Sequence, residues 1–445
     1  MINNIFIDKK NIYLSLVLFF IILIFSIWSK PNLIPNLSPD SYGYIRLAKD
    51  FQSDISEIRP FFFPLFIRMC LEINEANWQK LFLIIQLVMH ATLATYIFSL
   101  FQKIPLKKGI SFFLTLLIGL NPSLIYYSTY LLAESLFAIL TTLLWIFTIE
   151  YIRNMDSNKI NYTYLVLIGL SSGLSVVTKP IALFIIFPII FSILLTTKSS
   201  WIVVKSIFFI LIINFSFYQF WENYKKKNNP ELKFELLDAI EHGINMTALR
   251  AGMVDYGKGT VLYNYILENG MLDEAKNFKI EMSYTMNTQA NYLDFKNSIP
   301  WEIQNDKSFA IQIIKTAPLK LFLFSISNWH SFFTKRSFGP GDESFPGMPN
   351  IMRKLYYSTY SLLYRPFLLF MITFSFYILW VRKSLDILYP SGSLILYASL
   401  TVAVLTAHGG EFPRYRVWVE YIMWFCSLLP LGFLMQLLHA KLKRV

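Results

Sequence analysis

Residues 12–28 read IYLSLVLFFIILIFSIW and contain no charged side chain. A run of this length approaches the roughly 20 residues that an α-helix needs to cross the hydrocarbon core of a bilayer. Similar apolar runs recur along the chain. Within lipid, backbone polar groups must be satisfied internally, and the runs do not alternate as the strands of a membrane barrel do. The sequence therefore predicts an all-α, polytopic transmembrane helical bundle.

The composition supports a membrane protein and excludes a nucleic-acid-binding one. Of the 445 residues, 55% are hydrophobic and only 15% are charged, against roughly 25% charged in soluble domains. The net charge is +12, but Lys and Arg gather in short loops and at the termini, as expected of cytoplasmic anchors. Cys70 and Cys426 lie far apart, and their spacing fits neither a disulfide framework nor a metal motif.

The basic residues also predict the topology. Lys9 and Lys10 precede the first apolar run and place the N-terminus in the cytoplasm; no small-residue cleavage site follows Trp28, so this run is a retained span. We favour ten spans with the C-terminus in the cytoplasm, an arrangement in which the apolar segment 319–334 does not cross the membrane. If this segment does cross, the bundle has eleven spans. The candidate spans are 12–28, 79–101, 110–126, 130–150, 161–177, 180–197, 201–220, 319–334, 356–381, 393–407 and 417–438.

Two outer segments, 29–78 and 221–318, are too long to be simple connections. The first mixes aromatic and charged residues in the pattern of a short amphipathic helix on the membrane surface. The second has apolar residues at helical intervals, which predicts a small, mostly helical extracytoplasmic cap. The chain thus divides into an N-terminal transmembrane module (1–220), the cap (221–318) and a C-terminal transmembrane module (319–445).

The first outer segment contains the sequence SPDSYGY at residues 38–44, and RPFFFP follows at 59–64. A carboxylate just above a bilayer, beside aromatic rings and an arginine, is poorly explained by packing. Ionisable groups near the membrane are functional candidates by default. We therefore interpret Asp40 as the chemical centre, with Arg59 as a cation of the same site.

Further ionisable residues lie near the same face. Glu134 is about one turn into the fourth span, where it either serves this site or pairs with a lysine inside the bundle. Lys179 precedes Pro180 and either holds a phosphate or reaches lipid headgroups. Arg414 and Arg416 lie in a short outer turn, and guanidinium groups match phosphate oxygens. A local pair of Glu411 with Arg414 is the alternative.

Five motifs in order resemble the GT-C superfamily of glycosyltransferases, closest to its protein O-mannosyltransferase-like and lipopolysaccharide-modifying branch. The resemblance covers most of residues 10–200 and the stretch 400–435, whereas the cap resembles no known family. The motifs are Asp40-Ser41 to Tyr44, Arg59-Pro60 to Pro64, Asn121-Pro122 to Glu134-Ser135, Gly169-Leu170 to Thr178-Lys179-Pro180, and Glu411 to Arg414-Tyr415.

This resemblance implies an inverting transfer of a sugar from a polyprenyl-phosphate donor to an acceptor hydroxyl of a glycan, glycolipid or protein. It makes Asp40 the general base and Glu134 a second catalytic carboxylate. The implied ligands of the donor phosphate are Lys179, Arg414, Arg59, Arg416 and Tyr415; Tyr44, Glu411 and His330 would position substrates, although His330 also suits simple packing. A single acid in the first loop leaves dependence on a divalent cation open, and no other cofactor is expected.

Two other functions remain open from the sequence. A transporter or flippase for a lipid-linked saccharide could use the same charges, although these gather at one face and not along a pathway. The other open function is that of a non-catalytic receptor or assembly subunit. The composition, rich in Lys, Ile and Asn and with two cysteines, favours a bacterial inner membrane with the active site facing the periplasm.

Overall fold

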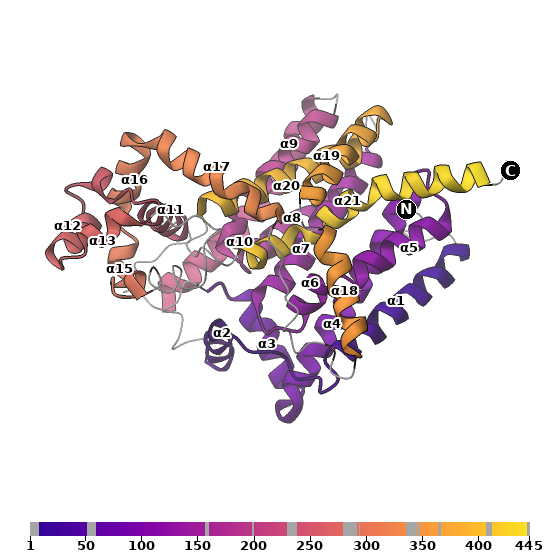
Figure 1. Cartoon of the computed structure of the whole chain (residues 1–445), viewed down its shortest axis with the longest axis horizontal. Helices are drawn as coiled ribbons and strands as arrows, with labels where there is room; N and C mark the ends of the chain where they lie inside the picture. The colour runs from indigo at the N-terminus through magenta and orange to yellow at the C-terminus, as the bar shows by residue number, and fades with distance from the viewer. Residues whose placement is uncertain are drawn as a thin grey trace.

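The computed structural model describes residues 9–50, 59–155, 160–197, 200–228, 238–278, 292, 294–334, 345, 348–363, 366–405 and 412–442. Within these ranges the chain is all-helical and contains no strand beyond one isolated bridge between Asn36 and Tyr130. The predicted fold class is confirmed. Figure 1 shows the small helices α11–α16 on the left and the long helices of the bundle at the centre and right.

Among the residues that the structure describes, six helical segments are long and apolar enough to cross a membrane: Ile12–Ser29, Glu75–Gln102, Ala133–Arg153, Trp201–Lys227, Leu385–Ala403 and Arg416–Leu442. These correspond to α1 (Lys9–Ser29), α4 (Trp78–Gln102), α7 (Ala133–Arg153), α10 (Ser200–Asn228), α20 (Leu385–Leu405) and α21 (Phe412–Leu442). The chain is therefore a polytopic integral membrane protein.

The remaining predicted spans are short or broken. Within the described ranges, length and composition alone therefore give six to eight spans, whereas the sequence patterns gave ten or eleven. The third is divided into α5 (Lys108–Gly119) and α6 (Pro122–Ser128), bent by 48°. Pro122 explains the break, because proline suits a helix start and not a helix interior. Three others are apolar helices of under 18 residues: α8 (Tyr162–Val176), α9 (Ile186–Thr196) and α19 (Pro366–Val381).

One end of the bundle collects basic residues. Lys103, at the end of α4, pairs with Glu150 of α7, and Arg153 pairs with Asp386 at the start of α20. The backbone N–H of Lys107 donates to Gln436 near the end of α21. The opposite end holds the start of α7, the end of α8 and the start of α21, and is called the site end below.

The segment 319–334 is not a straight continuation of the helix before it. It belongs to α17 (Pro318–Thr334), whose Pro318–Ile326 part turns by 90° from the preceding helical segment Trp301–Thr316. The carbonyl of Phe332 accepts a hydrogen bond from Arg416 at the site end, and Phe345 donates to Ser29 at the end of α1. Both flanks of 335–344 therefore lie at the site end.

The other described helices are shorter. In the first outer segment these are α2 (Pro39–Lys49), α3 (Phe62–Ile73) and the 3-10 turn η2 (Glu75–Asn77); η3 (Pro180–Phe184) precedes α9, and α18 (Asn350–Leu363) precedes α19. The cap region has its own buried core, which includes Met246, Leu262 and Phe309. Its helices are α11 (Asp238–Arg250), η4 (Val254–Gly257), α12 (Val261–Glu268), α13 (Leu272–Asn277), α15 (Trp301–Gln304) and α16 (Lys307–Thr316).

Candidate active site

Asp40 lies in the first turn of α2, and the start of this helix is fixed by local polar contacts. Proline at the first helical position and serine at the cap are favourable helix-start residues. The N–H of Ser38 donates to Ser41 Oγ at 2.9 Å, and Ser41 Oγ donates to the carbonyl of Leu131 at 2.8 Å. These bonds, with the bridge of Asn36 to Tyr130, hold α2 against the segment that leads into α7.

Glu134 occupies the first turn of α7, three residues after Leu131, so the same attachment brings it close to Asp40. Its side chain is only 2% exposed, and Lys179 Nζ lies 2.8 Å from Glu134 Oε1. Lys179 stands between the end of α8 and the 3-10 turn η3, where Pro180 interrupts the helix. A buried carboxylate requires such a partner, because an unpaired buried charge is strongly unfavourable.

Arg414, in the first turn of α21, joins the two carboxylates. Its Nε pairs with Glu134 Oε1, and its Nη2 pairs with Asp40 Oδ2. One planar guanidinium thus bridges two acids that lie 94 residues apart in the chain, and it comes from the far end of the sequence. The fork of donors in arginine suits this double contact, which lysine cannot reproduce.

Arg59 completes the cluster from the other side of Asp40. Its Nη2 lies 3.2 Å from Asp40 Oδ1, and its guanidinium lies over the Tyr44 ring at 5.1 Å. The segment after Arg59 is attached to the bundle, because the N–H of Phe62 donates to the carbonyl of Val177 at 3.0 Å. Tyr44 is itself buried and packs edge-on against Phe63.

Three cations, Arg59, Lys179 and Arg414, therefore face two carboxylates at the site end of the bundle. The side chain of Asp40 is 36% exposed, whereas that of Glu134 is 2% exposed, so Asp40 is the carboxylate that an incoming substrate can reach. Burial raises the pKa of Asp40, but Arg414 and Arg59 outweigh burial and hold this pKa below its ordinary value.

Arg416 is a predicted site residue that the structure does not bring to this cluster. Its side chain is fully buried, its Nε lies 2.9 Å from Glu420 Oε1, and its Nη1 donates to the carbonyl of Phe332 at 2.7 Å. We therefore assign Arg416 to the packing of α21 against α17 and no longer to phosphate binding. Glu411 and the side chains of Tyr415 and His330 lie outside the described residues.

The described part of this site offers few ligands for a divalent cation. Among the described residues, no three of His, Cys, Asp and Glu gather closely enough to hold a metal ion. Both carboxylates of the cluster are already paired with cations. Glu134 Oε2 is the exception, because it is buried and has no hydrogen-bond partner among the described residues.

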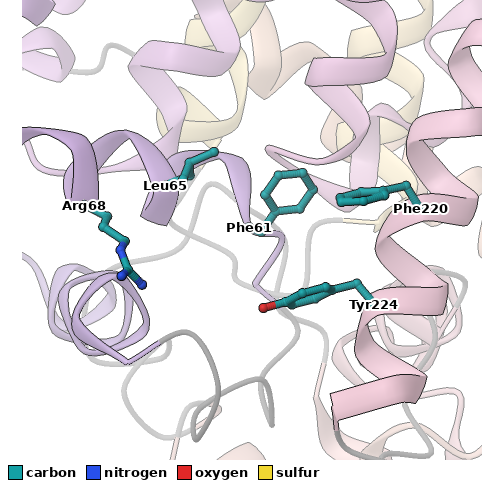
Figure 2. A pocket seen from close by; sticks show the side chains of 5 residues that line it. All are labelled: Phe61, Leu65, Arg68, Phe220 and Tyr224. Atoms are coloured by element: carbon teal, nitrogen blue, oxygen red, sulfur yellow. The ribbon is translucent and has the colours of Figure 1, made fainter.

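An apolar cavity between α3 and α10 was not anticipated from the sequence. It has a volume of about 270 Å³ and is lined by Phe61, Leu65, Arg68, Phe220 and Tyr224. Figure 2 shows the rings of Phe61, Phe220 and Tyr224 grouped between α3 and the last turns of α10, with Arg68 on the opposite side. The aromatic run at 61–63 was the only sequence signal for it, and Phe61 lies two residues from Arg59.

Residues 42–221 match the profile of the Alg9-like mannosyltransferase family. The match covers three of the motif segments on which the sequence resemblance to GT-C glycosyltransferases rests, and the last three residues of the first, and it supports that resemblance; Asp40 lies two residues before the match begins. Among solved structures, the chain is similar to the archaeal oligosaccharyltransferase AglB from Archaeoglobus fulgidus in complex with an inhibitory peptide and a dolichol-phosphate. That similarity has a TM-score of 0.48 and 13% sequence identity over 98% of this chain. The chain spans about half of the solved protein, 52% of its length. No curated protein matches the chain.

Proposed function

We infer, from the match of residues 42–221 to the Alg9-like mannosyltransferase family, that this protein is a membrane glycosyltransferase of the GT-C type with a lipid-phosphate sugar donor. In our proposal it transfers the sugar from a polyprenyl phosphate to the hydroxyl of a glycan, glycolipid or protein. The single observation that carries the chemistry is the convergence of Asp40, Glu134, Lys179 and Arg414 at one end of the membrane helices.

Asp40 is suited to the role of general base. A hydroxyl is a poor nucleophile, and a carboxylate within hydrogen-bond reach takes its proton as the new bond forms. The acceptor oxygen then bonds to the anomeric carbon, the bond from that carbon to the phosphate oxygen breaks, and the phosphate leaves with the electron pair. Attack from the face opposite the phosphate inverts the anomeric configuration.

Arg414 and Lys179 are suited to the departing phosphate. The leaving group gains negative charge in the transition state, and preorganised cations stabilise such charge most where water is excluded. Arg414 contacts both carboxylates, so a bound phosphate would compete for the same guanidinium. Glu134, with one buried oxygen left unpartnered among the described residues, would orient the sugar or stabilise its developing positive charge.

The apolar cavity at Phe61 and Phe220 supports a lipid donor. Its lining residue Phe61 is two residues from Arg59 in the chain. The helix α10 is exposed along its apolar residues, including Phe208, Ile212 and Phe220, as expected of a helix in contact with lipid. A prenyl chain could thus pass from the bilayer along α10 to the phosphate site. We place this site on the extracytoplasmic face of a bacterial inner membrane, with the N-terminal module and the cap around it.

Reconstitution into lipid vesicles with synthetic polyprenyl-phosphate sugars tests this function. We expect release of polyprenyl phosphate together with a new glycosidic bond on the acceptor, both detected by mass spectrometry. Lipid-linked sugars that accumulate in cells lacking the protein would identify the donor. Movement of an intact lipid-linked sugar across the vesicle membrane without cleavage would instead establish the transporter.

The lowered pKa of Asp40 predicts how transfer depends on pH. The folded pKa lies below the ordinary aspartate value, which is about 3.9, so the basic form persists as the pH falls toward that value. We expect the rate of transfer to stay level from neutral pH to about pH 5. The fall in rate that accompanies protonation of Asp40 should occur below the pH range in which an ordinary aspartate titrates. The stability from its ion pairs is likewise present above the unfolded pKa and lost as the pH falls through the folded pKa. A limb near neutral pH in the rate profile would contradict this assignment.

A further inference from the structure

Arg59 lies in a slot on the surface of α2 that three residues of a single turn create. Asp40, Gly43 and Tyr44 stand at positions i, i+3 and i+4 and therefore share one face of the helix. The carboxylate of Asp40 pairs with Arg59 Nη2 at 3.2 Å, and the ring of Tyr44 lies 5.1 Å from the guanidinium carbon. Gly43 lies between these two contacts along the helix.

The space at Gly43 is occupied by Arg59. A Cβ atom added to Gly43 would lie 1.4 Å from Arg59 Nη1 and 2.5 Å from Arg59 Cζ, far closer than any non-bonded contact. Gly43 is within α2 and is not among the glycines with positive φ, so its backbone does not require glycine. Glycine inside a helix is also less stable than alanine. The missing side chain, and not the backbone conformation, therefore accounts for glycine at this position.

We propose that Gly43 is a positioning residue, which keeps a slot open so that Arg59 can hold the Asp40 carboxylate in its reactive orientation. The role of Arg59 is then to orient Asp40, while Arg414 and Lys179 face the donor phosphate. The slot suits arginine in particular, because a flat guanidinium fits between a helix surface and an aromatic ring. The catalytic consequence of this inference rests on the proposed function, whereas the slot itself does not.

The variant Gly43→Ala tests the proposal, because the group it displaces is the end of a flexible side chain and the fold should persist. We expect the rate constant of transfer to fall at least tenfold, with the KM of the donor changed less than threefold. The acid limb of the pH–rate profile should move to higher pH as Asp40 loses a cation. Gly109→Ala is the matched control, because a Cβ there meets nothing within 4 Å, and it should leave activity unchanged.

A double-variant cycle separates the slot from a general effect on α2. In an Arg59→Ala background, Gly43→Ala should cause no further loss of transfer and should raise the melting temperature, because alanine then adds helix stability without a clash. An equal loss of transfer in both backgrounds, or full activity of Gly43→Ala alone, would overturn the proposal. If the native protein transfers no sugar, the melting temperatures of the four proteins in the cycle still test the slot. Failure of the proposed function can therefore be distinguished from failure of the slot proposal.

Discussion

Asp40→Asn is expected to reduce sugar transfer by about 10²–10⁴-fold, the range typical for loss of a general base. Asparagine keeps the shape of the side chain but cannot accept the proton of the acceptor hydroxyl. Because Arg414 and Lys179 stay in place, binding of the lipid-phosphate donor should be retained or slightly strengthened. The measurements are single-turnover transfer and donor binding in the same vesicles.

Glu75→Gln is the matched control for this variant. Glu75 is an exposed carboxylate in η2 that follows α3 in the first outer segment, so its loss changes the net charge equally without touching the cluster. It should leave transfer within twofold of the native rate. If Asp40→Asn retains native transfer, Asp40 is not the base, and Glu134 becomes the next candidate.

Arg414→Ala is expected to impair both activity and stability. The variant removes the cation that bridges Asp40 and Glu134, so transfer should fall about 10²–10³-fold, as for loss of one transition-state donor, with weaker donor binding. Glu134 keeps Lys179 as a partner, yet it is only 2% exposed, and loss of one of its two cations should cost about 1–3 kcal/mol in the free energy of unfolding. Chemical denaturation in detergent measures this change in the free energy of unfolding.

A second substitution separates these two effects. Arg414→Ala combined with Glu134→Gln removes the buried charge that the first change leaves under-compensated, so much of the stability should return while transfer stays low. Arg353→Ala is the control, since Arg353 is a surface arginine of α18 that contacts Asn350 at 2.7 Å. Recovery of activity together with stability in the double variant would show that Arg414 acts through the fold and not on the phosphate.

The apolar runs and basic loops were sufficient for the fold class. Segments such as 12–28 and 130–150 are long and apolar enough that the bilayer itself selects a helix. At 319–334, hydropathy left open whether the apolar segment crosses, and in the structure Pro318–Ile326 turns by 90° from the segment before it. Hydropathy measures how well a segment tolerates lipid, and it does not report the hydrogen bond from Arg416 to the carbonyl of Phe332, which connects α17 to the site end.

For the site, the sequence by itself determined which residue types lie near one face of the membrane: Asp40, Arg59, Glu134, Lys179 and Arg414 each lie in an outer segment or turn, or near the outer end of a predicted span. Only the tertiary structure decided that these five meet and that Arg416, two residues from Arg414, points into the core and pairs with Glu420. It alone also decided that Gly43 makes room for Arg59. The physical reason is that hydropathy and charge are properties of single segments, whereas an ion pair or a steric slot depends on the distance between atoms of different segments.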